Sequence, residues 1–249
     1  MALNNPGSGS PKRPPRPAND IAISCRATNP ISINDDLGKV FLDENQAKAT
    51  TATRLFRNDE IFNAITKVVM PGFFSATRSK FAMWSTGCSS GEEVYSMAMI
   101  ALTEIAKSKR SPLLEVFGTD INSSRIEEAR SGFYGRPSRD AFTPNYWRIL
   151  EKYAEIDSNS VTMGSKLRSI CKFKLFDMRN CPKKHFFFFI VCNHVLQYYD
   201  SDGQQHILRN LKAVLNPGGF LYLEGITTAG LEGSGLVKEG SIPNLYVCS

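Results

Sequence analysis

The chain has 249 residues, of which 42% are hydrophobic and 22% charged, as in an ordinary soluble globular protein with one large domain. Its net charge of +6 comes from scattered basic residues, so we expect no nucleic acid partner, and a basic surface suits an acidic protein. No apolar stretch is long enough to cross a bilayer, and the N-terminus has no secretory signal. The six cysteines form no CxxC pair and predict reduced thiols without a metal site, so we expect a cytoplasmic protein without membrane insertion.

The chain begins with a segment of low hydrophobicity. Residues 1–20 are rich in Pro, Gly, Ser and Asn, which cannot bury apolar area, and we expect a disordered arm there. Residues 21–50 carry only weak periodic signals. From "TATRLFRNDEIF" onward, apolar residues at helical spacing predict a helix that Pro71-Gly72 ends.

Strands then alternate with helices. The expected strands are "KFAMWST" (80–86), "LLEVFGTD" (113–120), "SICKFKLFD" (169–177), "FFFFIVCN" (186–193) and "FLYLEGI" (220–226). Helices are expected after the first strand, at "NSSRIEEARSG", at "TPNYWRILEKY" and at "SDGQQHILRNLKAVL", the first of them with a Ser89–Glu92 or Ser90–Glu93 capping box. The alternation predicts an α/β fold, a doubly wound and mostly parallel sheet with helices on both faces.

A glycine-serine loop, "TGCSSGEE", joins the first strand to its helix. In such a sheet the loop lies at the ligand-binding edge, and Gly87, Cys88 and Ser89 are small enough for a close backbone approach. A simple tight turn explains the loop equally well by itself. No phosphate-binding pattern of the GxGxxG or GxxxxGK[ST] type occurs. The Glu92-Glu93 pair suits instead a cofactor that carries an amine or a sulfonium.

Five segments resemble those of one known family: "TATRLFRNDEIF", "WSTGCSSGEEVYSMAM", "FGTDINSSRIEEARSGFY", "CNHVLQYYD" and "LNPGGFLYLE". In order and spacing they resemble the CheR family of chemoreceptor glutamate methyltransferases, from about residue 50 to the end of the chain. The resemblance implies an S-adenosylmethionine-dependent methyltransferase domain at 54–249, with a small antiparallel insertion at 152–172. It also implies an N-terminal helical domain, here shortened to 21–53, and an acidic protein partner such as the cytoplasmic region of a chemoreceptor.

The same resemblance implies roles for individual residues. The loop with Glu92 and Glu93 matches the part that holds the methionine end of the cofactor, and Asp120 matches the acid that binds the ribose. The other implied cofactor-binding residues are Thr51, Thr53, Arg57, Gly87, Cys88, Ser89, Asp177, Met178, Asn193 and His194. Arg57 and Tyr198 are the implied catalytic residues. Without the family match, a surface ion pair explains Arg57 and core packing explains Tyr198.

The chain departs from the family pattern at several positions. Asn193-His194 stands where the family has Arg-Asn, and Asp177 and Thr51 each replace an asparagine. The missing arginine is a candidate clamp for the acceptor carboxylate, so three functions stay open. They are a CheR-like protein glutamate methyltransferase, a methyltransferase of the same fold with another acceptor, for which His194 is a candidate base, and a silent relative that binds S-adenosylmethionine or a protein partner.

Overall fold

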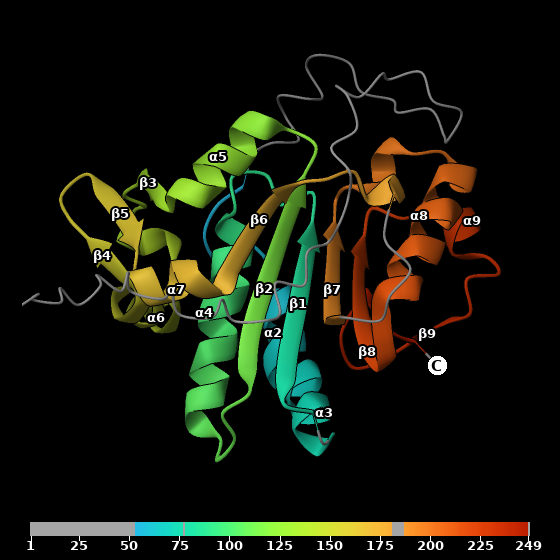
Figure 1. Ribbon diagram of the computed structural model, residues 1–249, viewed down its shortest axis with the longest axis horizontal. Helices are drawn as coiled ribbons and strands as arrows, with labels where there is room; N and C mark the ends of the chain where they lie inside the picture. Colours follow the sequence, from blue (N-terminus) through green and yellow to red (C-terminus); the bar gives the residue numbers. More distant parts are fainter. Residues whose placement is uncertain (1–52, 77, 181–186, 249) are drawn as a thin grey trace, which may run out of the picture. The chain divides into compact units, whose positions relative to one another are not determined.

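The computed structural model describes residues 53–76, 78–180 and 187–248 (Figure 1). The predicted arm at 1–20, Thr51 and all of the predicted segment 21–53 except Thr53 lie outside the described residues. Within the described part, no helix is both long enough and apolar enough to cross a membrane.

Seven strands form one mixed sheet. They are β1 (Lys80–Thr86), β2 (Leu113–Asp120), β6 (Cys171–Leu175), β7 (Phe187–Asn193), β8 (Leu215–Glu224), β9 (Leu236–Lys238) and β10 (Leu245–Cys248). Their order is β6-β2-β1-β7-β8-β10-β9, and the central strands lie side by side in Figure 1. Strands β6, β2, β1, β7 and β8 are parallel, whereas β10 and β9 pair antiparallel. The chain order reverses between β1 and β7, which confirms the doubly wound prediction and places a ligand site at the carboxyl ends of these strands.

Both faces of the sheet are covered. Along β1, Phe81 and Met83 pack in one hydrophobic cluster, and Ala82 and Trp84 pack in a second cluster. This alternation is the period of a strand with a core on each face. The first cluster includes the buried side of α4 (Glu92–Lys107), and the second includes that of α8 (Ser201–Val214). All but the last residue of β7 are buried, as predicted for a central strand.

The helix before β1 continues past Pro71-Gly72, so the prediction that this pair ends it is wrong. It consists of α2 (Asp59–Ala64), a π-helical segment η1 (Ile65–Val69) and α3 (Met70–Ser75). Pro71 lies in the first turn of α3, where a residue without an N–H is tolerated. A Cβ at Gly72 would lie 3.2 Å from the Phe220 ring, so the glycine allows this helix to approach β8.

Helix α4 begins where predicted, but the predicted capping boxes are wrong. Its N-cap is Gly91, with φ of 91° and without a side-chain cap, while Ser90 Oγ donates to Glu92 Oε2 at 2.8 Å. The next two long helices each have a side-chain cap. Asn122 caps α5 (Ser123–Ser131), and Thr143 caps α6 (Pro144–Tyr153).

A second, three-stranded antiparallel sheet accompanies the main one, as the fold prediction included. It contains β3 (Phe133–Gly135), β5 (Ser160–Met163) and β4 (Ala154–Ile156), in that order. The predicted range 152–172 contains β4, β5 and α7 (Ser165–Ile170), whereas β3 precedes it and β6 begins within it. The short elements that remain are η2 (Arg139–Ala141), η3 (Met178–Asn180), η4 (Leu196–Tyr198) and α9 (Thr228–Leu231).

Candidate functional site

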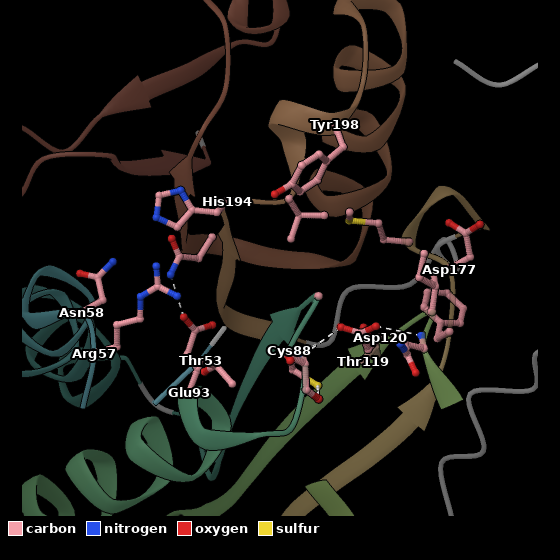
Figure 2. A pocket seen from close by; sticks show the side chains of 18 of the residues that line it. Thr53, Arg57, Asn58, Cys88, Glu93, Thr119, Asp120, Asp177, His194 and Tyr198 are labelled. Carbon is pink, nitrogen blue, oxygen red and sulfur yellow. Dashed lines mark hydrogen bonds between the residues drawn. The ribbon is translucent and has the colours of Figure 1, made fainter. Parts of the chain in front are cut away.

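A cavity of about 510 Å³ opens at the carboxyl ends of β1, β2 and β7, where the strand order reverses (Figure 2). Five separate segments of the chain line this cavity. They lie within residues 53–62, 87–93, 119–123, 176–178 and 193–199. The sequence-predicted residues among its lining are Thr53, Arg57, Gly87, Cys88, Ser89, Glu93, Asp120, Asp177, Met178, Asn193, His194 and Tyr198. Figure 2 shows Arg57, Glu93 and His194 toward one end, with Asp120 and Asp177 toward the other.

The segment that carries Arg57 is anchored by its neighbour Phe56. The Phe56 ring is 4% exposed and stacks on Tyr146 with centroids 4.8 Å apart. The backbone N–H of Phe56 donates to Ser96 Oγ at 2.9 Å, and Ser96 Oγ donates to the Glu92 carbonyl at 2.6 Å. The first turn of α4 therefore holds the segment. Phe56 has a left-handed backbone with φ of 51°, a strained conformation for a bulky residue. The next residue, Arg57, is exposed and lines the cavity.

Glu93 and Asn193 place acceptor oxygens at this end of the cavity. Ser85 Oγ donates to Glu93 Oε1 at 2.7 Å, and Asn193 Nδ2 donates to Glu93 Oε2 at 3.0 Å. Burial raises the pKa of Glu93, although these hydrogen bonds and the charge of Arg57 lower it in part. Asn193 Oδ1 is buried without a hydrogen-bond partner within the described part of the chain. A carboxylate beside an unpaired carbonyl oxygen suits a cationic group with several N–H donors, such as an ammonium.

Asp120 is fixed at the end of β2 by backbone groups. The Ser89 N–H donates to its Oδ2 at 2.9 Å, and the Asn122 N–H donates to its Oδ1 at 2.8 Å. Ser89, with φ of 50°, turns the glycine-serine loop so that its N–H faces this carboxylate. Each carboxylate oxygen keeps a further lone pair, so Asp120 can accept two hydroxyl donors at once.

The far end of the cavity combines a neutralised acid with apolar walls. The Asp177 carboxylate is buried. It accepts from the Arg179 side chain, with Nε at 2.8 Å, and from the Arg179 backbone N–H at 2.9 Å. This ion pair removes a net charge from the site. Ile121, Phe176 and Met178 add apolar surface that suits a flat aromatic base.

His194 forms the rim near Arg57. It has a left-handed backbone with φ of 56°, and its Nε2 lies 3.4 Å from Glu224 Oε1. Asn58 Nδ2 donates to Glu224 Oε2 at 3.1 Å, while Asn58 Oδ1 caps α2. Tyr198 also lines the cavity, and its hydroxyl accepts from Gln197 Nε2 at 2.8 Å.

One predicted residue, Glu92, is absent from the cavity lining and faces Ser90. Another, Thr51, lies outside the described residues. The lining residues that the sequence analysis missed are Arg54, Asn58, Phe62, Thr119, Ile121, Asn122, Ser123, Phe176, Val195 and Tyr199. Most of them adjoin a predicted site residue in the sequence, which is the signal that would have found them. Among the described residues, no group of three or more His, Cys, Asp or Glu could hold a metal ion.

Comparison with known proteins identifies the fold family. The family model of the CheR methyltransferase SAM-binding domain matches residues 51–226. The chain belongs to the CheR methyltransferase family. The predicted S-adenosylmethionine cofactor is thereby confirmed for this CheR-family domain, and the paired acceptors at Glu93 and Asn193 fit its ammonium group.

The relatives of this CheR-family chain include proteins named for chemotaxis. The chemotaxis protein methyltransferase of Listeria monocytogenes is 27% identical over 189 residues, which cover 75% of this chain and 69% of the relative. Chemotaxis protein methyltransferase 1 of Vibrio cholerae is 28% identical over 196 residues, which cover 76% of this chain and 68% of the relative. An uncharacterized 104.1 kDa protein of Rhodobacter capsulatus is 25% identical over 175 residues, or 70% of this chain and 18% of that protein. The chain thus matches about two thirds of the length of the two named methyltransferases and less than a fifth of the Rhodobacter protein.

Proposed function

We propose that this protein transfers a methyl group from S-adenosylmethionine to glutamate carboxylates of a protein, as in chemoreceptor methylation. We assign this activity to the domain at 54–249. The family and the names of the chemotaxis relatives support the reaction class. The observation that carries the proposal is one cavity with an ammonium-binding pair, Glu93 and Asn193, at one end and the carboxylate of Asp120 toward the other.

The cofactor would be held by residues of three strand ends. Glu93 and Asn193 would accept from its ammonium group, and Asp120 would accept from its ribose hydroxyls. Ile121, Phe176 and Met178 would flank its adenine. When bound, the cofactor supplies a methyl group on a sulfonium, and the sulfur keeps the electron pair of the bond that breaks.

The protein's own contribution would be alignment and desolvation. A glutamate acceptor is ionised at neutral pH, since its ordinary pKa is about 4.3, so no general base is required. Holding two reactants in line is worth an effective molarity of about 10⁵–10⁸ M. Arg57 lies beside Glu93 on the cavity wall, and its planar guanidinium can hold a carboxylate through two parallel hydrogen bonds. Tyr198 would limit the room around the reacting atoms.

The partner that we propose is an acidic protein, specifically the cytoplasmic region of a chemoreceptor, so the protein would act in the cytoplasm. Two exposed arginines that line the cavity, Arg54 and Arg57, support an acidic partner because they would attract it electrostatically. The free thiols of the described cysteines, Cys88, Cys171, Cys192 and Cys248, are those expected in a reducing compartment.

A second candidate function is methyl transfer to a neutral hydroxyl or amine. The observation that favours it is the contact between His194 Nε2 and Glu224 Oε1 at 3.4 Å, because a carboxylate can orient a histidine that accepts a proton. Such an acceptor must lose a proton during the reaction, whereas a glutamate carboxylate need not.

One labelling experiment tests both candidates. The protein is incubated with methyl-labelled S-adenosylmethionine and a soluble cytoplasmic fragment of a chemoreceptor, and the product is treated with mild base. We expect the fragment to carry label that base releases, because methyl esters hydrolyse readily. Label that resists base would indicate the neutral acceptor, and absence of label would indicate a silent relative.

A further inference from the structure

We infer that His194, oriented by Glu224, is a specificity-determining residue that holds the acceptor carboxylate. This inference rests on the proposed function, since it concerns how a glutamate acceptor is recognised. Asn193, at the end of β7, carries no charge and donates to Glu93. A second cation is therefore required from elsewhere at this end of the cavity if the acceptor is to be held from two sides.

His194 is held by β8 through both its backbone and its ring. Asn193 pairs with Glu224 in the register of β7 and β8, and the His194 N–H donates to the Glu224 carbonyl at 3.2 Å. The ring Nε2 lies 3.4 Å from Glu224 Oε1. Since 42% of the side chain is exposed and it lines the cavity, the ring remains accessible to an acceptor.

Glu224 is oriented by partners on the side away from the histidine. Its Oε2 accepts from Asn58 Nδ2 at 3.1 Å and lies 3.2 Å from the Tyr222 hydroxyl. The Tyr222 hydroxyl also lies 2.9 Å from Glu60 Oε2. These contacts leave Glu224 Oε1 for the imidazole. With Nε2 directed at Glu224, the Nδ1–H of the charged ring remains as a donor.

The charges around His194 show why its own charge matters. Glu224 faces the ring from β8, Glu93 contributes from α4, and Arg57 contributes from the segment before α2. Glu60 lies beyond Tyr222. Without a charge on His194, an approaching carboxylate meets two carboxylates and one guanidinium at this end. With the charge, two cations balance the two carboxylates, and an acceptor carboxylate no longer meets a net negative charge.

The test compares the parent with His194→Asn and His194→Arg between pH 6 and pH 9. Asparagine tolerates the left-handed backbone of this position and offers an N–H donor without charge, whereas arginine keeps a charge at every pH. The probe is the soluble chemoreceptor fragment, in parallel with a version that has glutamine at each methylation site. Kinetics give the KM for the fragment and the KM for S-adenosylmethionine. Calorimetry in the presence of S-adenosylhomocysteine gives the affinity for both fragments without turnover.

We expect His194→Asn to raise the KM for the fragment about ten-fold at pH 6, as for loss of a charged hydrogen bond. The KM for S-adenosylmethionine should change less than the KM for the fragment. The parent's KM for the fragment should rise with pH toward that of the Asn variant, because Nδ1 can donate to the acceptor only in the charged ring. The Arg variant should keep a low KM throughout. The Asn variant should also lose the preference for the glutamate fragment over the glutamine fragment, and Glu224→Gln should have a smaller effect in the same direction.

Equal affinity of the parent and the Asn variant for the glutamate fragment at pH 6 would overturn the inference. The inference would also be overturned if the parent's activity rises with pH and the kcat of the Asn variant falls. That result would make His194 a base for a neutral acceptor. If the parent produces no methyl ester at any pH, the proposed function fails. The calorimetric comparison still decides whether His194 binds the carboxylate.

Discussion

Glu93 is a carboxylate that the folded protein holds at an energetic cost. Its pKa is raised by burial, so the folded state binds the Glu93 proton more tightly than the unfolded chain does. Ionising the group above the ordinary glutamate pKa of about 4.3 therefore lowers the free energy of unfolding. The carboxylate at this position thus works against stability and is explained by the cation that it would bind.

We predict that Glu93→Gln stabilises the cofactor-free protein at pH 7 and weakens its affinity for S-adenosylmethionine. The Asn193 amide can turn so that its unpaired Oδ1 accepts from the new glutamine, which keeps the pair hydrogen-bonded. The gain in stability should shrink as the pH falls and should vanish only below the ordinary glutamate pKa of about 4.3, where the group is protonated in both states. Thermal unfolding measured across pH and calorimetry of cofactor binding check the two parts. A loss of stability at pH 7 with unchanged affinity would contradict both.

Arg57 should matter more to turnover than to folding. The buried Leu55-Phe56 pair anchors the segment, and the exposed guanidinium lines the cavity. We predict that Arg57→Lys lowers the methyl-transfer rate nearly as much as Arg57→Ala, because lysine keeps the charge but loses the planar fork. Initial rates of the three proteins, with circular dichroism to verify folding, measure this. Full activity of the Lys variant would show that charge alone suffices, and full activity of both would reduce Arg57 to a surface ion pair worth about 0–1 kcal/mol.

At the scale of single elements, the start of α4 depends on one glycine. Gly91 has φ of 91°, and a Cβ there would lie 2.7 Å from Ala129 Cβ and 3.0 Å from the Phe173 ring. Helix α5 and strand β6 therefore approach the loop that borders the cavity only because this position lacks a side chain.

We predict that Gly91→Ala lowers the free energy of unfolding by about 1–3 kcal/mol, through overpacking and backbone strain. Gly135→Ala is the matched control, since nothing lies within 4 Å of its added Cβ and its φ is not positive. Urea unfolding of the two variants beside the parent gives the comparison. Equal stability of all three proteins would show that α5 and β6 can move aside at little cost.

Local sequence patterns correctly predicted those elements whose apolar pattern and flanking turn residues indicate the same bounds. The bounds of β1 and β2 match the predictions because each apolar run ends at small or polar residues. The end predicted at Pro71-Gly72 is wrong because packing against Phe220 continues the helix. The predicted capping box of Ser89 is wrong because its N–H binds Asp120 instead. Strand β3 was missed because three largely exposed residues carry no alternating pattern.

The residues of the candidate site also differ in how far the sequence alone could place them. Asp120 and the glycine-serine loop follow strands, so their place at the ligand edge could be predicted from the sequence alone. The contact between His194 and Glu224 depends on the pairing of β7 with β8, and that between Asn58 and Glu224 joins residues 166 positions apart. No local pattern contains such information, because register and helix docking are decided by tertiary packing.

At the scale of the whole molecule, the cavity is assembled from five segments that reach from Thr53 to Tyr199. A ligand that contacts all of them can stabilise elements far apart in the chain. Binding to the folded state alone adds about 2.7 kcal/mol of stability at a ligand concentration of 100 times Kd.

We therefore predict that S-adenosylhomocysteine raises the Tm of the parent and slows amide exchange in 53–58, 87–93, 119–123 and 193–199 together. Asp120→Ala should lose about 1.5–3 kcal/mol of binding free energy, as for a charged hydrogen bond, and most of the shift in Tm. Asp140→Ala, at an exposed position outside the cavity, is the matched control. Differential scanning fluorimetry and hydrogen exchange measure both effects, and protection confined to one segment would contradict a shared binding site.

The left-handed backbones of Phe56, Ser89 and His194 have a consequence for the inheritance of this sequence. Such a conformation costs a residue with a side chain about 1–2 kcal/mol, a cost that glycine avoids. Selection for folding alone would therefore favour codon changes to glycine at Ser89 and His194, whereas at Phe56 the packing of the buried ring offsets the strain. A lineage that no longer uses the cavity is expected to acquire glycine at Ser89 and His194 early, whereas this chain keeps a hydroxyl and an imidazole there.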